Sequence, residues 1–291
     1  GTIWIASANS ALFSFNPLTE VFNMYSLKGL TEDGGKPLVP SSIAIDANNN
    51  IWLGANGTLI IFNQQKRKFQ VFSKPPEKQA DGAFVYRTYF DSFGNLWQGA
   101  SSIGLIKYEN RAILKSYSHT KGDLTSLSPG WAGQINESVD GKIWITTADV
   151  TGGLCVLDPG TRSIQSIPYQ NILPGIWGVA GFAEFSPGEF YVSTVGRGLH
   201  QFSLKSNMMK KISLEGVADS VLIFRFYQDK DDYWLCTNAG LFKRKNEQDS
   251  FTRYDLSSLT GSNGSSNQIT DLFKSETHGL WLLTNNGLFL Y

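Results

Sequence analysis

The feature that most constrains this chain of 291 residues is a short motif that recurs seven times. In each copy a turn leads into an apolar strand centred on an aromatic residue, as in GNLWQGASSIGLIKY at residues 94–108. Successive aromatic residues are 48, 45, 47, 47, 43 and 47 positions apart, about 46 on average. A period of this length built from short alternating strands is typical of β-propeller blades. The seven anchoring residues are Trp4, Trp52, Trp97, Trp144, Tyr191, Trp234 and Trp281.

One repeat, residues 42–72, contains the pattern of four antiparallel strands, the number that makes one blade. Its two middle strands are apolar on both sides, as expected of a sheet that neighbours cover on both faces. The sequence therefore predicts an all-β, seven-bladed β-propeller occupying residues 1–291 as a single domain. The first repeat begins at its second strand and the last stops at its third, so each lacks one strand. We expect the chain to be a fragment of a larger sensor; the alternative is closure with two three-stranded blades.

Composition excludes several partners and crosslinks. The 25 basic and 25 acidic residues cancel, which argues against nucleic acid and against an anionic membrane surface as partners. No apolar run approaches the roughly 18 residues that span a bilayer. Cys155 and Cys236 fall at different positions in different repeats, so we expect two buried thiols and no disulfide.

Two stretches carry a family resemblance. GKIWITTADVTGGLCVLDPGTRSIQSI (141–167) and ALFSFNPLTEVFNMY (11–25) resemble the two-component regulator propeller repeat, from which the fifth repeat departs by placing Tyr191 where Trp is usual. In that family, paired seven-bladed propellers form the periplasmic sensor region of bacterial hybrid two-component system histidine kinases. The resemblance implies a non-catalytic periplasmic module that senses a glycan-derived ligand and controls polysaccharide-utilisation genes. It also implies a second propeller as partner, and a homodimer is possible.

Catalytic signatures are missing from the sequence. There is no nucleophile elbow, no zinc-protease helix motif and no phosphate-binding loop. The seven-bladed streptogramin lyases need clustered His and Glu, whereas His119, His200 and His278 are scattered. We therefore expect no enzyme activity, no cofactor and no metal. A streptogramin-lyase-like lyase or hydrolase remains one alternative, and a pure protein-interaction scaffold is another.

Clusters of charge have simple explanations as surface features. The acidic run 229–232 and the stretch 46–50 lie where the first hairpin of a blade belongs, so solvated turns explain them better than calcium sites. The basic runs 66–68 and 243–245 are expected on a solvated rim.

The long connections of the blades predict where a ligand binds. Links from strand four to the next strand one share a face of the propeller with the turns between strands two and three, and loops carry function more often than the scaffold does. We call this side the long-loop face; its long links are 28–40, 74–83, 119–129, 169–176 and 257–268. Aromatic rings that stack on sugar C–H faces, with polar groups for the hydroxyls, suit a glycan or oligosaccharide. The alternative for Trp131 and Trp177 is that they plug the inner ring. The candidate ligand-binding residues are Tyr86, Arg87, Trp131, Asp149, Trp177, Arg197, Arg225, Asn238 and Asn285.

Overall fold

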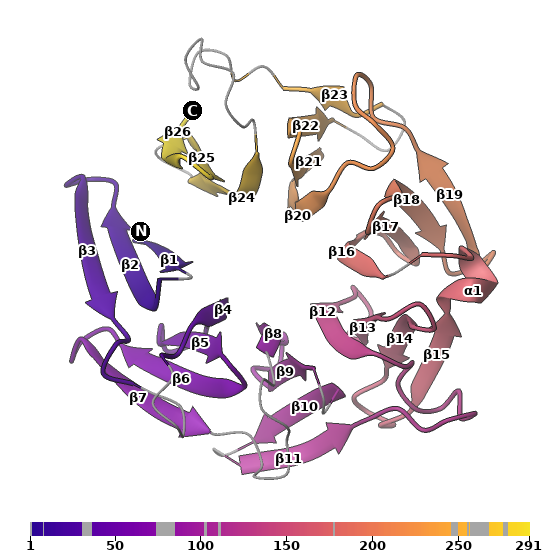
Figure 1. Cartoon of the computed structure of the whole chain (residues 1–291), viewed down its shortest axis with the longest axis horizontal. Helices are drawn as coiled ribbons and strands as arrows, with labels where there is room; N and C mark the ends of the chain where they lie inside the picture. Colours follow the sequence, from indigo (N-terminus) through magenta and orange to yellow (C-terminus); the bar gives the residue numbers. More distant parts are fainter. Residues whose placement is uncertain are drawn as a thin grey trace. The chain divides into compact units, whose positions relative to one another are not determined.

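The chain is an all-β, seven-bladed β-propeller whose first and last blades have three strands and whose other blades have four (Figure 1). In every blade consecutive strands pair antiparallel, so the predicted fold class is confirmed. No helix among the described residues is long and apolar enough to cross a membrane. The computed structural model describes residues 2–7, 9–30, 37–73, 85–101, 104–109, 112–176, 178–245, 250–254, 256, 268–275 and 279–291.

The strands fall into two compact units, and the first, residues 1–167, holds four blades. Their first strands contact one another in chain order, β4 with β8 and β8 with β12. Blade 1 comprises β1 (Ile3–Ser7), β2 (Ala11–Asn16) and β3 (Val21–Ser26); blade 2 comprises β4 (Pro40–Ile45), β5 (Ile51–Ala55), β6 (Thr58–Asn63) and β7 (Lys68–Ser73). Blade 3 comprises β8 (Val85–Phe90), β9 (Leu96–Ala100), β10 (Gly104–Glu109) and β11 (Ala112–Tyr117); blade 4 comprises β12 (Trp131–Glu137), β13 (Ile143–Ala148), β14 (Gly153–Leu157) and β15 (Ile164–Pro168).

The second unit, residues 168–291, holds three blades and one short helix, α1 (Tyr169–Ile172). Here β16 contacts β20, and β20 contacts β24. Blade 5 comprises β16 (Val179–Ser186), β17 (Glu189–Thr194), β18 (Gly198–Ser203) and β19 (Met208–Ile212). Blade 6 comprises β20 (Ile223–Asp229), β21 (Asp232–Thr237), β22 (Gly240–Arg244) and β23 (Thr252–Arg253); blade 7 comprises β24 (Ile269–Ser275), β25 (Gly279–Thr284) and β26 (Gly287–Leu290).

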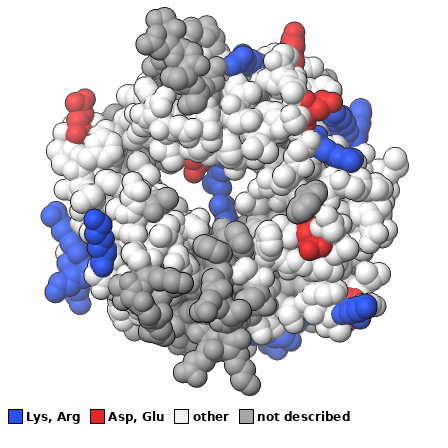
Figure 2. Space-filling model, viewed as in Figure 1, with Lys and Arg blue, Asp and Glu red and all other residues white. Residues whose placement is uncertain are grey.

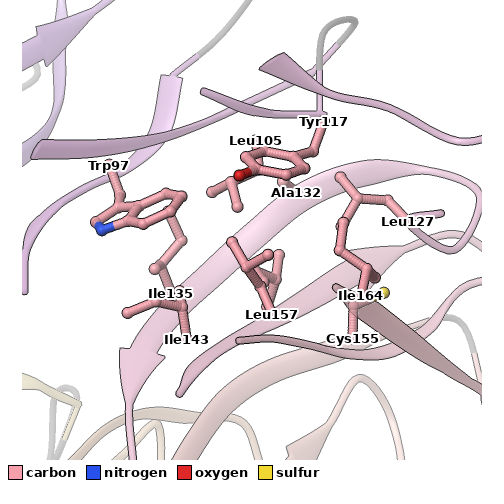
Figure 3. Packing of buried hydrophobic residues seen from close by; sticks show 11 residues of the cluster. Trp97, Leu105, Tyr117, Leu127, Ala132, Ile135, Ile143, Cys155, Leu157 and Ile164 are labelled. Atoms are coloured by element: carbon pink, nitrogen blue, oxygen red, sulfur yellow. The ribbon is translucent and has the colours of Figure 1, made fainter. Parts of the chain in front are cut away.

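The hydrophobic core lies between neighbouring blades, as Figure 3 shows for blades 3 and 4. Trp97 and Tyr117 of blade 3 pack against Ile135 and other aliphatic side chains of blade 4, and Trp97 is fully buried. Two residues after Trp97, a Cβ at Gly99 would lie 2.7 Å from the backbone oxygen of Ala132. Blades 3 and 4 therefore approach each other closely beside this glycine.

In blades 2 and 3 a carboxylate holds the anchoring tryptophan. Asp91 Oδ2 accepts the indole N–H of Trp97 at 2.8 Å, and the same side chain accepts backbone and side-chain N–H groups of Asn95. In blade 2, Asp46 accepts the indole N–H of Trp52 at 2.9 Å. Partial burial raises the pKa of Asp46, but hydrogen bonds from Asn50, Trp52 and Asn48 together outweigh it, so the net pKa is lowered. These hairpin turns therefore also fix the core.

Blades 5 and 6 meet around a buried arginine, where the sequence predicted a solvated rim for residues 243–245. Arg244, on β22, is only 7% exposed. Its guanidinium carbon lies 4.7 Å from the ring centre of Tyr191, 5.2 Å from Phe251, 5.3 Å from Tyr233 and 5.5 Å from Phe185. The rim prediction is thus wrong for Arg244, because strand alternation places it on the same buried face as the core side chain two residues earlier. Cys155 and Cys236 are buried free thiols, as expected.

Candidate ligand-binding face

Six blades share one backbone irregularity at the start of their first strand. The pairing register with the second strand shifts between Pro40 and Ser42 in blade 2 and between Ile223 and Arg225 in blade 6, and the other four behave alike. Such a β-bulge re-aims side chains and is common beside functional sites. The unpaired residues are Ser41, Tyr86, Gly133 with Gln134, Ala180, Phe224 and Thr270.

Three of the predicted ligand-binding residues lie in the first strands of their blades. Tyr86 and Arg87 lie in β8 and Trp131 opens β12, just after the predicted links 74–83 and 119–129. Tyr86 is the unpaired bulge residue of blade 3, because β9 pairs with Val85 and then with Arg87. The side chain of Tyr86 and the whole of Trp177 lie outside the described residues.

In the first unit, two of the predicted residues come close together. Trp131 pairs with Ala148, and a Cβ at the preceding Gly130 would lie 2.7 Å from Cβ of Asp149. Trp131 is 44% exposed, so it does not act as a fully buried plug. Asp149 accepts both the hydroxyl and the backbone N–H of Thr151, and this side-chain hydrogen bond lowers its pKa. The lowered pKa keeps this carboxylate charged at neutral pH, and it lies on the turn that approaches Gly130, the residue before Trp131.

In the second unit, Arg225 meets a residue that the sequence analysis missed. Arg225 Nε lies 3.5 Å from Asp271 Oδ1, and the two side chains are 40% and 54% exposed. Both residues come directly after the bulge, in β20 and in β24 respectively. The sequence does not show that Arg225 and Asp271 occupy equivalent positions in their blades, because Trp234 follows Arg225 by nine residues while Trp281 follows Asp271 by ten.

Asn238 and Asn285 form hydrogen bonds to the residues that precede the first strands of blades 6 and 7. Asn238 Oδ1 accepts the backbone N–H of Leu222 at 3.0 Å, and its own N–H donates to the oxygen of Leu222 at 3.1 Å. Asn285 Nδ2 donates to Gln268 Oε1 at 2.8 Å. The turn between strands two and three is thereby tied to the link before the bulge, so both residues position the chain at the predicted face.

Arg197 lies on the turn after β17 and donates to the backbone oxygen of Pro174 at 3.2 Å. It lines a small cavity of about 10 Å³ with Lys211 and Asp219, which form an ion pair. That volume is below the roughly 300 Å³ of small-ligand pockets, so the cavity itself is not a ligand site. Leu222 and Phe224, on the neighbouring blade, are 37% and 36% exposed.

The histidine and acidic side chains of the described residues do not cluster as metal ligands. No group of three His, Cys, Asp or Glu side chains that could hold a metal occurs among the described residues. His119 Nδ1 bonds to the oxygen of Leu127, His200 is buried with a lowered pKa caused by that burial, and His278 is not among the described residues. Charged side chains are scattered in small groups over the face viewed in Figure 2, where uncharged residues predominate.

These features define the class of protein: a β-propeller built from sequence repeats, in which the first strand of six blades carries a bulge. No protein-family model and no curated protein matches the chain. Among solved structures it is similar to the extracellular domain of the hybrid two component system BT4673 from B. thetaiotaomicron (TM-score 0.76, 17% identity, 99% of this chain and 38% of that chain). The corresponding domain of BT3049 from the same organism matches with a TM-score of 0.68 and 21% identity over 86% of this chain and 33% of that one.

A third similar structure is PorZ, a surface component of the type-IX secretion system of Porphyromonas gingivalis. It has a TM-score of 0.72 and 16% identity, over 100% of this chain and 44% of that chain. This chain therefore spans less than half the length of each of the three. At these identities the likeness establishes the fold.

Proposed function

We propose that this chain is a non-catalytic sensor module, one propeller of the extracytoplasmic region of a hybrid two-component signalling protein. Two extracellular domains of hybrid two-component systems share its fold over 86% and 99% of its length, and this observation carries the proposal. The resemblance of its repeats to the two-component regulator propeller repeat supports the same assignment. The ligand is glycan-derived, and its binding controls genes for polysaccharide use.

The ligand binds at the long-loop face, and a second propeller of the same protein is the partner of this one. The half-exposed Trp131 offers a stacking ring, and Asp149, which approaches the neighbouring Gly130, offers a charged acceptor; both groups suit a sugar. Trp177 and Arg87 belong to the same proposed face. The opposite face carries the basic turn 66–68, whose three side chains are exposed.

Glycan-array screening of the complete extracytoplasmic region, followed by calorimetry with the best glycan, tests the proposal. Alanine substitution of Arg87, Trp131 and Trp177 should weaken binding by about tenfold or more, whereas alanine substitution of residues 66–68 should not. Loss of binding in the 66–68 variant alone would show that the face is assigned to the wrong side.

The similarity to PorZ favours a second candidate, a protein-interaction scaffold at the bacterial surface. PorZ is matched over the whole of this chain, and it is described as a secretion-system component. If no glycan binds the complete region while a protein partner is retained by the long-loop face, the scaffold function replaces the sensor.

A further inference from the structure

The bulge of blade 6 differs in its side chains from the bulges of blades 2 and 7. In those two blades the unpaired residue carries a hydroxyl that donates to the carbonyl of the paired strand: Ser41 to Gly54 at 3.2 Å and Thr270 to Leu283 at 3.1 Å. Blade 6 places Phe224 there, which has no hydroxyl to donate, and leaves its ring 36% exposed. The ring of Phe224 therefore does not make the backbone hydrogen bond that Ser41 and Thr270 make at this position.

Arg225, the residue after Phe224, forms a long ion pair with Asp271. Arg225 and Asp271 touch through Nε and Oδ1 at 3.5 Å, which is too long for a good hydrogen bond. Oδ1 also accepts the backbone N–H of Leu272 at 2.8 Å. Within the described part of the chain, the two terminal guanidinium nitrogens of Arg225 and Oδ2 of Asp271 make no hydrogen bond. Donors and an acceptor thus stand side by side in a half-exposed place.

From this arrangement we infer that Phe224, Arg225 and Asp271 form a subsite for an uncharged sugar ring. The apolar face of the sugar stacks on Phe224, while neighbouring hydroxyls accept from the guanidinium and donate to the carboxylate. The inference rests on the proposed glycan-sensing function and names its ligand class. An acidic or sulfated sugar gains no net attraction here, because the opposite charges of Arg225 and Asp271 largely cancel.

A second ion pair on the same two strands supplies a matched control. Asp229 at the end of β20 and Lys274 of β24 are bonded to each other, at the ends of these strands away from the bulges. D229N therefore removes an ion pair between the same blades without touching the proposed subsite. F224T gives blade 6 the residue that blade 7 uses at its bulge, so the backbone is expected to keep its conformation.

The test measures binding of the complete extracytoplasmic region to neutral gluco-, manno-, xylo- and galacto-oligosaccharides and to oligogalacturonate and sulfated oligosaccharides, by calorimetry. We expect a neutral oligosaccharide to bind, F224T and D271N each to weaken it about tenfold, and D229N to leave it within about twofold. Thermal melts of D271N and D229N should agree, which separates loss of contact from loss of folding. The charge-swapped double variant R225D/D271R keeps an ion pair but should bind the neutral oligosaccharide as weakly as D271N does.

Four results would overturn the subsite in distinguishable ways. A neutral glycan that binds F224T and D271N as well as wild type places the ligand elsewhere while leaving the sensor function intact. Tighter binding of the acidic or sulfated oligosaccharides than of the neutral ones would show that the ligand class is wrong. Full binding by the charge-swapped variant would show that Arg225 and Asp271 do not contact the ligand. Absence of binding to every glycan overturns the proposed function and this subsite together.

Discussion

The hydrogen bond between Trp97 and Asp91 makes blade 3 the place to measure what the aspartate clamp contributes. Trp97→Phe removes an N–H that donates to a carboxylate at 2.8 Å in a fully buried place. Losing a hydrogen bond to a charged group costs about 1.5–3 kcal/mol, and the smaller ring forfeits about 1 kcal/mol of apolar burial. We expect a loss of about 3 kcal/mol in the free energy of unfolding.

Trp234→Phe is the matched control. Trp234 is 5% exposed, and its indole nitrogen has no hydrogen-bond partner among the described residues. Each of the two rings carries a lysine, Lys107 at 5.4 Å from Trp97 and Lys243 at 4.6 Å from Trp234, so this contribution largely cancels in the comparison. Removing an unsatisfied buried N–H offsets the lost area, and the cost should be about 1 kcal/mol or less.

Urea unfolding followed by circular dichroism measures both variants against wild type. With a slope of about 2 kcal/mol per molar urea, Trp97→Phe should lower the midpoint by about 1.5 M and Trp234→Phe by under about 0.5 M. A double-mutant cycle of Trp97→Phe with Asp91→Ala should give a coupling energy of about 2 kcal/mol. Equal midpoints for the two phenylalanine variants, or a coupling energy near zero, would refute the clamp.

Four further outcomes follow from the packing and the titrating groups. Trp52→Ala should cost about 3–5 kcal/mol, and a thermal melt within a degree of wild type would contradict it. Folding lowers the pKa of Asp46 below its ordinary 3.8, so its contribution is complete above that pH and is lost as pH falls through the folded pKa; below about pH 4 the urea midpoint of wild type should fall more steeply than that of D46N. Gly99→Ala places a methyl group 2.7 Å from a carbonyl of the next blade and should cost about 1–3 kcal/mol, while Gly29→Ala, with nothing within 4 Å, should be near neutral by the same assay. Arg244→Lys should cost about 1–2 kcal/mol, because an ammonium cannot stack on the surrounding rings as a guanidinium does; an unchanged melting temperature would deny the cage its stabilising role.

The blades were predictable from the sequence because each depends on one large aromatic side chain and on local turn chemistry. Trp97 and Trp144 mark second strands in both sequence and structure. The aspartate clamp was also visible in principle: Asp46 and Asp91 each precede their tryptophan by six residues, with an asparagine between them. For the stretch 46–50 the composition alone predicts no more than a solvated turn, since acidic and amide residues are common in turns.

The bulges and the Arg225–Asp271 pair were not predictable in the same way. A bulge is a relation between two strands, two residues opposite one, and no residue type in a single strand requires it. The variety of its members, from Ser41 to Phe224, confirms this. Asp271 became visible only when strand contacts brought β20 beside β24. The roles of the other predicted ligand-binding residues stay predictions.

The cage around Arg244 limits how this protein can have been assembled by duplication. Successive repeats look interchangeable, since each carries its own anchor and its own hairpins. Yet the guanidinium belongs to blade 6, while the rings of Tyr191 and Phe185 that receive it belong to blade 5. Copying blade 6 alone would bury the arginine without two of its four rings, and copying blade 5 alone would leave the rings of Tyr191 and Phe185 without their cation. Recombination that conserves the fold should therefore keep blades 5 and 6 together and place its crossovers outside residues 179–253.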